Sequence, residues 1–404
     1  MPDFDALLTG TTAIAFALTV ALAFLAPRLR KAKPNAVTAG IVPRLPNETV
    51  SLPVEHDDPD YLECVVLSQH VADLMLADEW TEIAHEIADW EASLASTPGG
   101  VRFHEIALKT CLSGLQGLLE EAPRNTLADL KDALTEVGHF MDTYRQTPDN
   151  HIFAVLAARA HIAIGEACSG DDWPEAERKI AWRRMARHFI AAGEILENFD
   201  AQASMSPLLA EAMYLQALGS PKAEEKLHPL YRQWIDLDPS NSGIYDTHIG
   251  ALVSLDLISG DDVLKEADEA MRRTQGSLGF GGYALFFLPL LSEYDSARDL
   301  LDPELYAAAL MDLASNSATQ AEINHSAAAL LVEIDAADMA ESTAYRDTLL
   351  LLIRQHLEVI YPRVWPISVE EIQELVAEAA FVAPDIDLED TTSFVTSRPQ
   401  GLAA

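Results

Sequence analysis

The chain has 404 residues, 49% of them hydrophobic and 23% charged, so it is long enough to bury a sizeable core and too apolar to be disordered throughout. Its 27 basic and 64 acidic side chains give a formal net charge of −37. A surface that acidic repels phosphate backbones, and we therefore expect no nucleic-acid partner.

The first predicted element is an apolar segment, residues 6–26, which contains no charged side chain. A helix of this length spans about 30 Å, the thickness of the hydrocarbon core of a bilayer. Only Asp3 and Asp5 carry charge before it, and the basic residues that follow it are Arg28, Arg30, Lys31 and Lys33. A secretory signal has its positive charge before the apolar run, so this order predicts a single-pass transmembrane helix instead. The positive-inside rule leaves residues 1–5 as a short outer tail and the body in the cytoplasm, which in a bacterium means anchoring in the inner membrane.

Residues 27–59 predict a linker, because prolines recur along them and their charge changes from basic to acidic. The end of the chain, residues 383–404, mixes Asp, Thr, Ser and Pro with little apolar material. This composition predicts a disordered tail.

Between these ends, residues 60–382 show helical periodicity without sustained period-two alternation. Their connections are short, so we expect neighbouring helices to be antiparallel and the body to be an all-α solenoid of helical hairpins. The predicted helices span 61–75, 80–94, 103–119, 127–144, 152–168, 174–199, 206–218, 222–237, 244–258, 263–274, 283–291, 303–314, 318–333, 345–360 and 369–381. The segment 152–168 is apolar on nearly every face, which predicts a buried central helix.

Two features indicate a repeat. The turn Ser-Gly-Asp-Asp occurs at 169–172 and, 90 residues later, at 259–262, each time before a helix with an Arg-Arg pair. Within 223–252, Leu237-Asp238-Pro239 ends one predicted helix and Tyr245 opens the next. This junction resembles that of tetratricopeptide repeats, although loop lengths vary and a fixed period of about 34 residues is absent. The resemblance implies protein–protein recognition on an irregular, tetratricopeptide-like scaffold.

One helix of this acidic body is basic. Residues 175–190 carry five basic against two acidic side chains, and Lys179, Arg183 and Arg187 stand four residues apart on one ridge, with Arg184 beside it. A basic ridge attracts an acidic partner or lipid headgroups. The alternative is that these cations pair with acidic neighbours inside the solenoid.

The sequence contains no recognisable catalytic motif. The Gly-x-Ser-x-Gly and Gly-x-x-x-x-Gly-Lys-Ser/Thr motifs are absent. Cys64, Cys111 and Cys168 are widely spaced and form no Cys-x-x-Cys pair, which argues against a disulfide framework or a thiolate zinc site.

Four Glu-x-x-His pairs have the spacing that di-iron helical bundles use: Glu82/His85, Glu136/His139, Glu225/His228 and Glu322/His325. A di-iron site also needs single glutamates from other helices, such as Glu63. In an antiparallel hairpin, however, Glu63 and Glu82 would lie more than ~15 Å apart along the helix axis, too far to share the ions. We therefore expect no metal ion, no cofactor and no catalytic residue, and we expect that the protein is not an enzyme.

These observations predict a membrane-anchored helical-repeat scaffold, or assembly module, that binds protein partners of a membrane complex at the cytoplasmic face. One alternative is a structural accessory subunit held in a larger complex by its transmembrane helix. A second alternative is a helical-bundle metalloenzyme that uses the Glu-x-x-His pairs.

Overall fold

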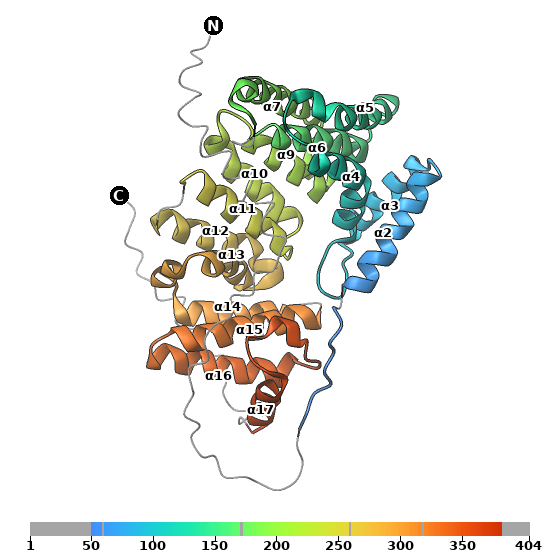
Figure 1. Ribbon diagram of the computed structural model, residues 1–404. Helices are drawn as coiled ribbons and strands as arrows, with labels where there is room; N and C mark the ends of the chain where they lie inside the picture. Colours follow the sequence, from blue (N-terminus) through green and yellow to red (C-terminus); the bar gives the residue numbers. More distant parts are fainter. Residues whose placement is uncertain (1–49, 59, 170–172, 258–259, 317–318, 382–404) are drawn as a thin grey trace.

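The computed structural model describes residues 50–58, 60–169, 173–257, 260–316 and 319–381. Within these ranges the chain is helical, and its β-structure is limited to isolated bridges, which confirms the all-α prediction (Figure 1). Every helix in the described ranges is too short or too polar to cross a membrane. The predicted transmembrane helix 6–26, its basic flank Arg28, Arg30, Lys31 and Lys33, and the two tails 1–5 and 383–404 lie outside the described residues.

The helices follow the predicted order closely. The first half of the chain forms α2 (Tyr61–Leu76), α3 (Trp80–Ser93), α4 (Phe103–Glu121), η1 (Leu127–Leu130), α5 (Lys131–Gln146), α6 (His151–Ala167), α7 (Glu175–Leu196), α8 (Ala201–Ser204) and α9 (Pro207–Leu218). The second half forms α10 (Ala223–Leu237), α11 (Ser242–Ser254), α12 (Gly260–Leu278), α13 (Gly281–Glu293), η2 (Asp295–Leu300), α14 (Pro303–Asn316), α15 (Gln320–Ala336), α16 (Met339–His356), η3 (Pro362–Val364) and α17 (Val369–Ala379).

Several helix boundaries differ from the prediction by a few residues, and in two of these cases capping residues override apolar periodicity. The segment predicted as one helix, 127–144, begins as the 3₁₀ turn η1, where Thr126 and Asp129 form a capping box. Helix α16 begins at Met339 rather than at 345, because the Asp338 side chain accepts hydrogen bonds from the backbone N–H groups of Ala340 and Glu341.

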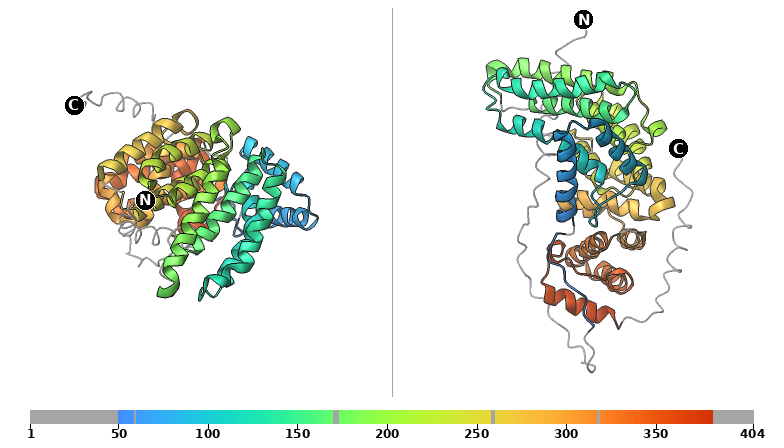
Figure 2. Two further views of the ribbon diagram at one scale, coloured as in Figure 1. Left: turned by 90° about the horizontal axis from the view of Figure 1, so that it is seen from above. Right: turned by 90° about the vertical axis from the view of Figure 1, so that its right-hand side faces the viewer.

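The helices stack in repeat-like layers, with α5–α7 at one end and α17 at the other (Figures 1 and 2). The closest neighbours are the sequential pairs α6–α7, α9–α10, α12–α13 and α15–α16. The stacking is irregular, since α2 packs more closely on α4 than on α3, and α14 packs more closely on α16 than on α15. These layers share one continuous apolar core in the described part of the chain.

The predicted 90-residue repeat does not describe this packing. The repeat would make the α6–α7 pair equivalent to the α11–α12 pair, so α11 should pack on α12 as α6 packs on α7. The α6–α7 pair is the most closely packed one in the described structure. Helix α11 packs instead on α10 and α13, and α12 packs its apolar side against α13. Similar turn sequences therefore connect helices that pack differently.

Helix α6 is the buried central helix that the sequence predicts. It packs against α3, α4, α5, α7 and α9, and residues 152–158 are buried without interruption. Its first turn is capped by Asn150, whose side chain accepts a hydrogen bond from the Ile152 N–H at 2.9 Å.

The described end of the predicted linker, residues 50–58, is bound rather than free. Val54 forms a parallel β-bridge with Ile360, and the Gln373 side chain bonds both the N–H and the carbonyl of Leu52, at 3.1 and 2.7 Å. Leu52 and Val54 also pack against the core. These contacts hold this end of the predicted linker beside α17 (Figure 1).

Candidate functional sites

Helix α7 separates an apolar side from a basic side. Its buried side chains, Met185 and Phe189 among them, face the core, where α7 packs on α6 and α9. Lys179, Arg183 and Arg187 are exposed on the opposite side. The four-residue spacing thus produces the single ridge that the sequence predicts.

The three ridge cations have no carboxylate partner in the described part of the chain, where no ion pair of 4.0 Å or less involves them. The second Arg-Arg pair behaves differently. On α12, Arg273 contacts Asp236 at 2.7 Å and Glu269 at 2.9 Å, and Arg272 contacts Glu269 at 3.2 Å. Internal pairing, the alternative for the basic helix, therefore describes α12 and not the α7 ridge.

Two large apolar side chains lie exposed along the same side of α7. Ile180 is 50% exposed and Ile190 is 60% exposed. Together with Lys179, Arg183 and Arg187 they form what we call the basic face of α7. An exposed surface that combines cations with apolar side chains is typical of protein-binding sites, because charge guides the encounter and apolar area stabilises the complex.

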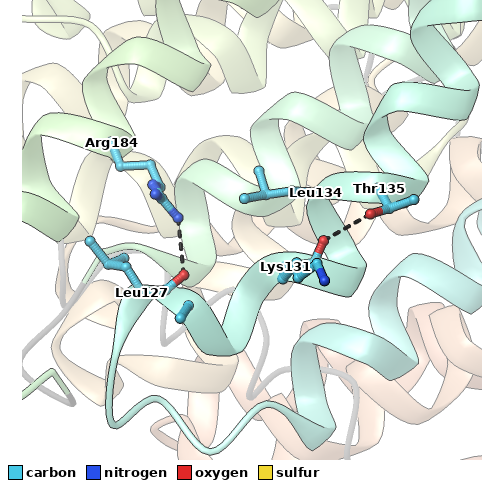
Figure 3. Close-up of a pocket in the computed structure, with 6 residues that line it drawn as sticks. Leu127, Lys131, Leu134, Thr135 and Arg184 are labelled. Atoms are coloured by element: carbon cyan, nitrogen blue, oxygen red, sulfur yellow. Dashed lines mark hydrogen bonds between the residues drawn. The ribbon is translucent and has the colours of Figure 1, made fainter.

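Arg184 does not belong to this face. Its Nη1 donates a hydrogen bond to the Leu127 carbonyl at 3.1 Å, which ties α7 to η1 (Figure 3). Together with Lys131, Leu134 and Thr135, the two residues line a shallow depression of about 410 Å³. The guanidinium of Arg184, which the sequence groups with the partner-binding residues, is thus turned toward a backbone carbonyl.

The Glu-x-x-His pairs do not converge on a common site within the described residues. Three of the histidines, His85, His139 and His325, make only local contacts, to Asp89 at 3.4 Å, to Glu136 at 3.2 Å and to the Ala321 carbonyl at 2.9 Å. His228 turns away from Glu225, which pairs with Lys222. The pairs are therefore no di-iron arrangement in the described structure.

His228 joins instead a cluster that sequence reasoning missed. Its Nδ1 lies 2.8 Å from Glu266 Oε1, and His248 Nε2 lies 3.7 Å from Glu266 Oε2. One ligand-type atom from each residue lies within 4.8 Å of the other two. The three residues come from α10, α11 and α12, so no local spacing in the sequence could have indicated the cluster.

The charges of this cluster are set by burial and mutual contact. Burial by itself would raise the pKa of Glu266, but His228 and His248 hold it at about 2. The contact with Glu266 raises the pKa of His228, whereas burial lowers the pKa of His248. The arrangement thus holds a carboxylate against two imidazoles, of which the buried one stays neutral.

A second histidine pair lies between α6 and α7, where the Nδ1 atoms of His161 and His188 are 2.9 Å apart. Burial, together with the charges of His161 and Arg184, lowers the pKa of His188 to about 4, and burial also lowers the pKa of His161. Both rings are therefore neutral at pH 7, and one donates a hydrogen bond to the other.

We expect this pair to make the fold acid-sensitive. The unfolded chain binds a proton at His188 below about pH 6.5, but the folded chain does not until about pH 4, so stability present above pH 6.5 is lost as the pH falls. The expected loss for this half-buried pair is about 1–2 kcal/mol at pH 5. Urea midpoints at pH 8, 6.5 and 5, for the wild type and for His188→Gln, measure it.

Glutamine keeps a hydrogen-bonding side chain but does not titrate. The difference in unfolding free energy between the wild type and His188→Gln should therefore shrink as the pH falls. His139→Gln is the matched control, because it makes the same substitution at an exposed site. A wild type and a His188→Gln variant that respond identically to acid would contradict the assignment.

Comparison of the chain with protein-family models, with curated proteins and with solved structures found no match.

Proposed function

We propose that the protein is a membrane-anchored helical-repeat scaffold that binds an acidic protein partner through the basic face of α7. The observation that carries this proposal is that Lys179, Arg183 and Arg187 have no carboxylate partner in the described structure, although the chain has 64 acidic residues. Cations that contribute no internal ion pair to the fold are available to a partner.

An acidic protein segment fits this face better than a lipid surface does. Ile180 and Ile190 flank the cations and supply apolar area that a partner side chain can cover. The described chain begins at residue 50 beside α17, at the end of the stack opposite α7 (Figure 1). If the apolar segment 6–26 anchors the chain, the basic face lies at the end of the body farthest from the point where the anchored chain enters it.

The anchor itself rests on the sequence. Residues 6–26 carry no charge and Arg28, Arg30, Lys31 and Lys33 follow them, which favours a single span with the body in the cytoplasm, at the inner membrane if the source is bacterial. Anchoring raises the local concentration of the scaffold at the membrane. The repeat-like stacking and the tetratricopeptide-like junction at Leu237-Asp238-Pro239 support a binding role rather than catalysis.

The test is an affinity pull-down of the full chain from membranes in mild detergent, beside a variant in which Lys179, Arg183 and Arg187 are changed to Glu. We expect the wild type to recover an acidic partner in stoichiometric amount, and we expect salt to weaken this binding. The variant should recover at least about tenfold less of the partner, because long-range attraction becomes repulsion.

A matched control changes Lys109, Lys226 and Arg363 to Glu, which alters the net charge equally at scattered exposed sites. This control should retain the partner. A partner kept equally by both variants would place the contact elsewhere, as in an accessory subunit held by its transmembrane helix. A chain recovered from the soluble fraction would contradict the anchor.

A further inference from the structure

We propose that His228, His248 and Glu266 form a binding site for one divalent transition-metal ion of the zinc class, which joins α10, α11 and α12. The two imidazoles and the carboxylate are the ligand types that zinc prefers, and two histidines with one glutamate are a known zinc ligand set. The proposal is independent of the basic face, because α7 contributes nothing to the cluster.

Buried polar atoms that make no hydrogen bond carry the argument. His228 Nδ1, His248 Nε2 and Glu266 Oε2 are buried and make no hydrogen bond in the described structure, and their contacts are limited to ion-pair distances within the cluster, 2.8 Å from His228 Nδ1 to Glu266 Oε1 and 3.7 Å from His248 Nε2 to Glu266 Oε2. Buried polar atoms in native interiors almost always have a partner. Because one ligand-type atom from each of the three residues lies within 4.8 Å of the other two, a cation bound among them would satisfy all three residues at once.

The surroundings hold the ligands in place as metal sites require. The other ring nitrogen of His248, Nδ1, lies 2.8 Å from the hydroxyl of buried Tyr214, so Nδ1–H can donate there and leave Nε2 with its lone pair free. The Tyr231 ring stacks on His248 at 3.7 Å with an interplanar angle of 8°. These two contacts hold the plane of the imidazole, and the tautomer with its hydrogen on Nδ1 leaves Nε2 able to bind a metal ion.

The distances suit a small ion with nitrogen and oxygen ligands. Ligands about 2.0–2.2 Å from a tetrahedral zinc ion are about 3.3–3.6 Å apart. His228 Nδ1 lies 2.8 Å from Glu266 Oε1 and His248 Nε2 lies 3.7 Å from Glu266 Oε2, distances on either side of that range, so the residues are close to the spacing that such an ion requires. Magnesium and calcium are disfavoured, because they require more oxygen ligands than one carboxylate supplies.

The site has a route to solvent. The His228 side chain is 33% exposed, whereas those of His248 and Glu266 are 0% and 10% exposed. An ion can therefore enter past His228, and water can occupy the fourth position. The expected consequence is that bound metal links three successive helices and raises the stability of the middle of the stack.

The test is calorimetric titration of ZnCl₂ into the full chain, held in mild detergent after removal of any affinity tag and of metal with chelator. We expect one ion per chain with a Kd below about 1 μM, and a melting temperature that rises with added zinc and falls with chelator. His228→Ala and Glu266→Gln should each weaken binding by more than about 100-fold, since they remove a direct ligand.

His139→Ala is the matched control, because His139 belongs to another Glu-x-x-His pair and is exposed; it should bind zinc as the wild type does. Circular dichroism of each variant checks folding, and His228→Asn replaces His228→Ala if the latter unfolds. A wild type that binds zinc no more tightly than about 10 μM, or equal affinity in folded His228 and Glu266 variants, would overturn the site and leave an ion pair in its place.

Discussion

Replacing Arg102 by alanine is expected to destabilise the fold by about 3–5 kcal/mol, the cost of leaving a buried charge without its partner. Arg102 Nε donates to Asp238 Oδ2 at 2.8 Å and Nη2 donates to Oδ1, while the Asp238 side chain is 0% exposed. Nη2 also donates to Ser240 Oγ at 2.8 Å. Urea unfolding followed by tryptophan fluorescence measures the loss.

The matched control is Arg145→Ala, which removes an exposed pair with Asp142 on one helix turn. It should cost less than about 0.5 kcal/mol, since solvent screens such pairs. Replacing Arg102 and Asp238 together by Met and Leu should recover most of the stability, because no charge then stays buried. An Arg102→Ala loss below about 1 kcal/mol would contradict the role of the pair.

The Arg102–Asp238 pair connects two parts of the chain that are far apart in the sequence. Arg102 precedes α4, and Asp238 ends α10 at the tetratricopeptide-like junction, 136 positions away in sequence. In the same junction the Asn241 side chain caps α11 and donates to Glu105 Oε1 at 2.5 Å. Burial raises the pKa of Glu105 to about 7. The junction therefore ties the first helices of the body to its middle.

Replacing Glu91 by alanine should cost about 2–3 kcal/mol, because it leaves buried donors without an acceptor. Glu91 is 3% exposed, and its Oε1 accepts hydrogen bonds from Ser206 Oγ at 2.6 Å and from the Leu208 N–H at 3.0 Å. Its other oxygen lies 3.1 Å from His151 Nε2. The carboxylate of α3 thus caps the N-terminus of α9, where the helix dipole also favours negative charge.

Thermal and urea unfolding of Glu91→Ala, Glu91→Gln and Glu82→Ala test this role. Glutamine keeps an acceptor oxygen, so its loss should be smaller than that of alanine. Glu82 is exposed on the same helix and should cost less than about 1 kcal/mol. Equal losses for Glu82→Ala and Glu91→Ala would show that the buried contacts contribute nothing.

Local patterns in the sequence were sufficient to predict the helices. Periodicity located nearly every helix to within a few residues, and the apolar surface of 152–168 predicted the buried α6. The spacing of Lys179, Arg183 and Arg187 likewise predicted one exposed ridge. These features depend on residues within one or two turns of each other, so they can be read without knowing the fold.

The sequence by itself thus determined an all-helical body, the approximate positions of its helices and the position of its basic ridge. Only the tertiary structure decided that Arg184 donates to a backbone carbonyl and that α11 packs on α13. It also decided that the partner of Asp238 is Arg102. It also brought His228, His248 and Glu266 together from three helices. The formation of each helix is governed by residues near one another along the chain. The packing of helices depends instead on which apolar faces fit together and on which buried charges form ion pairs.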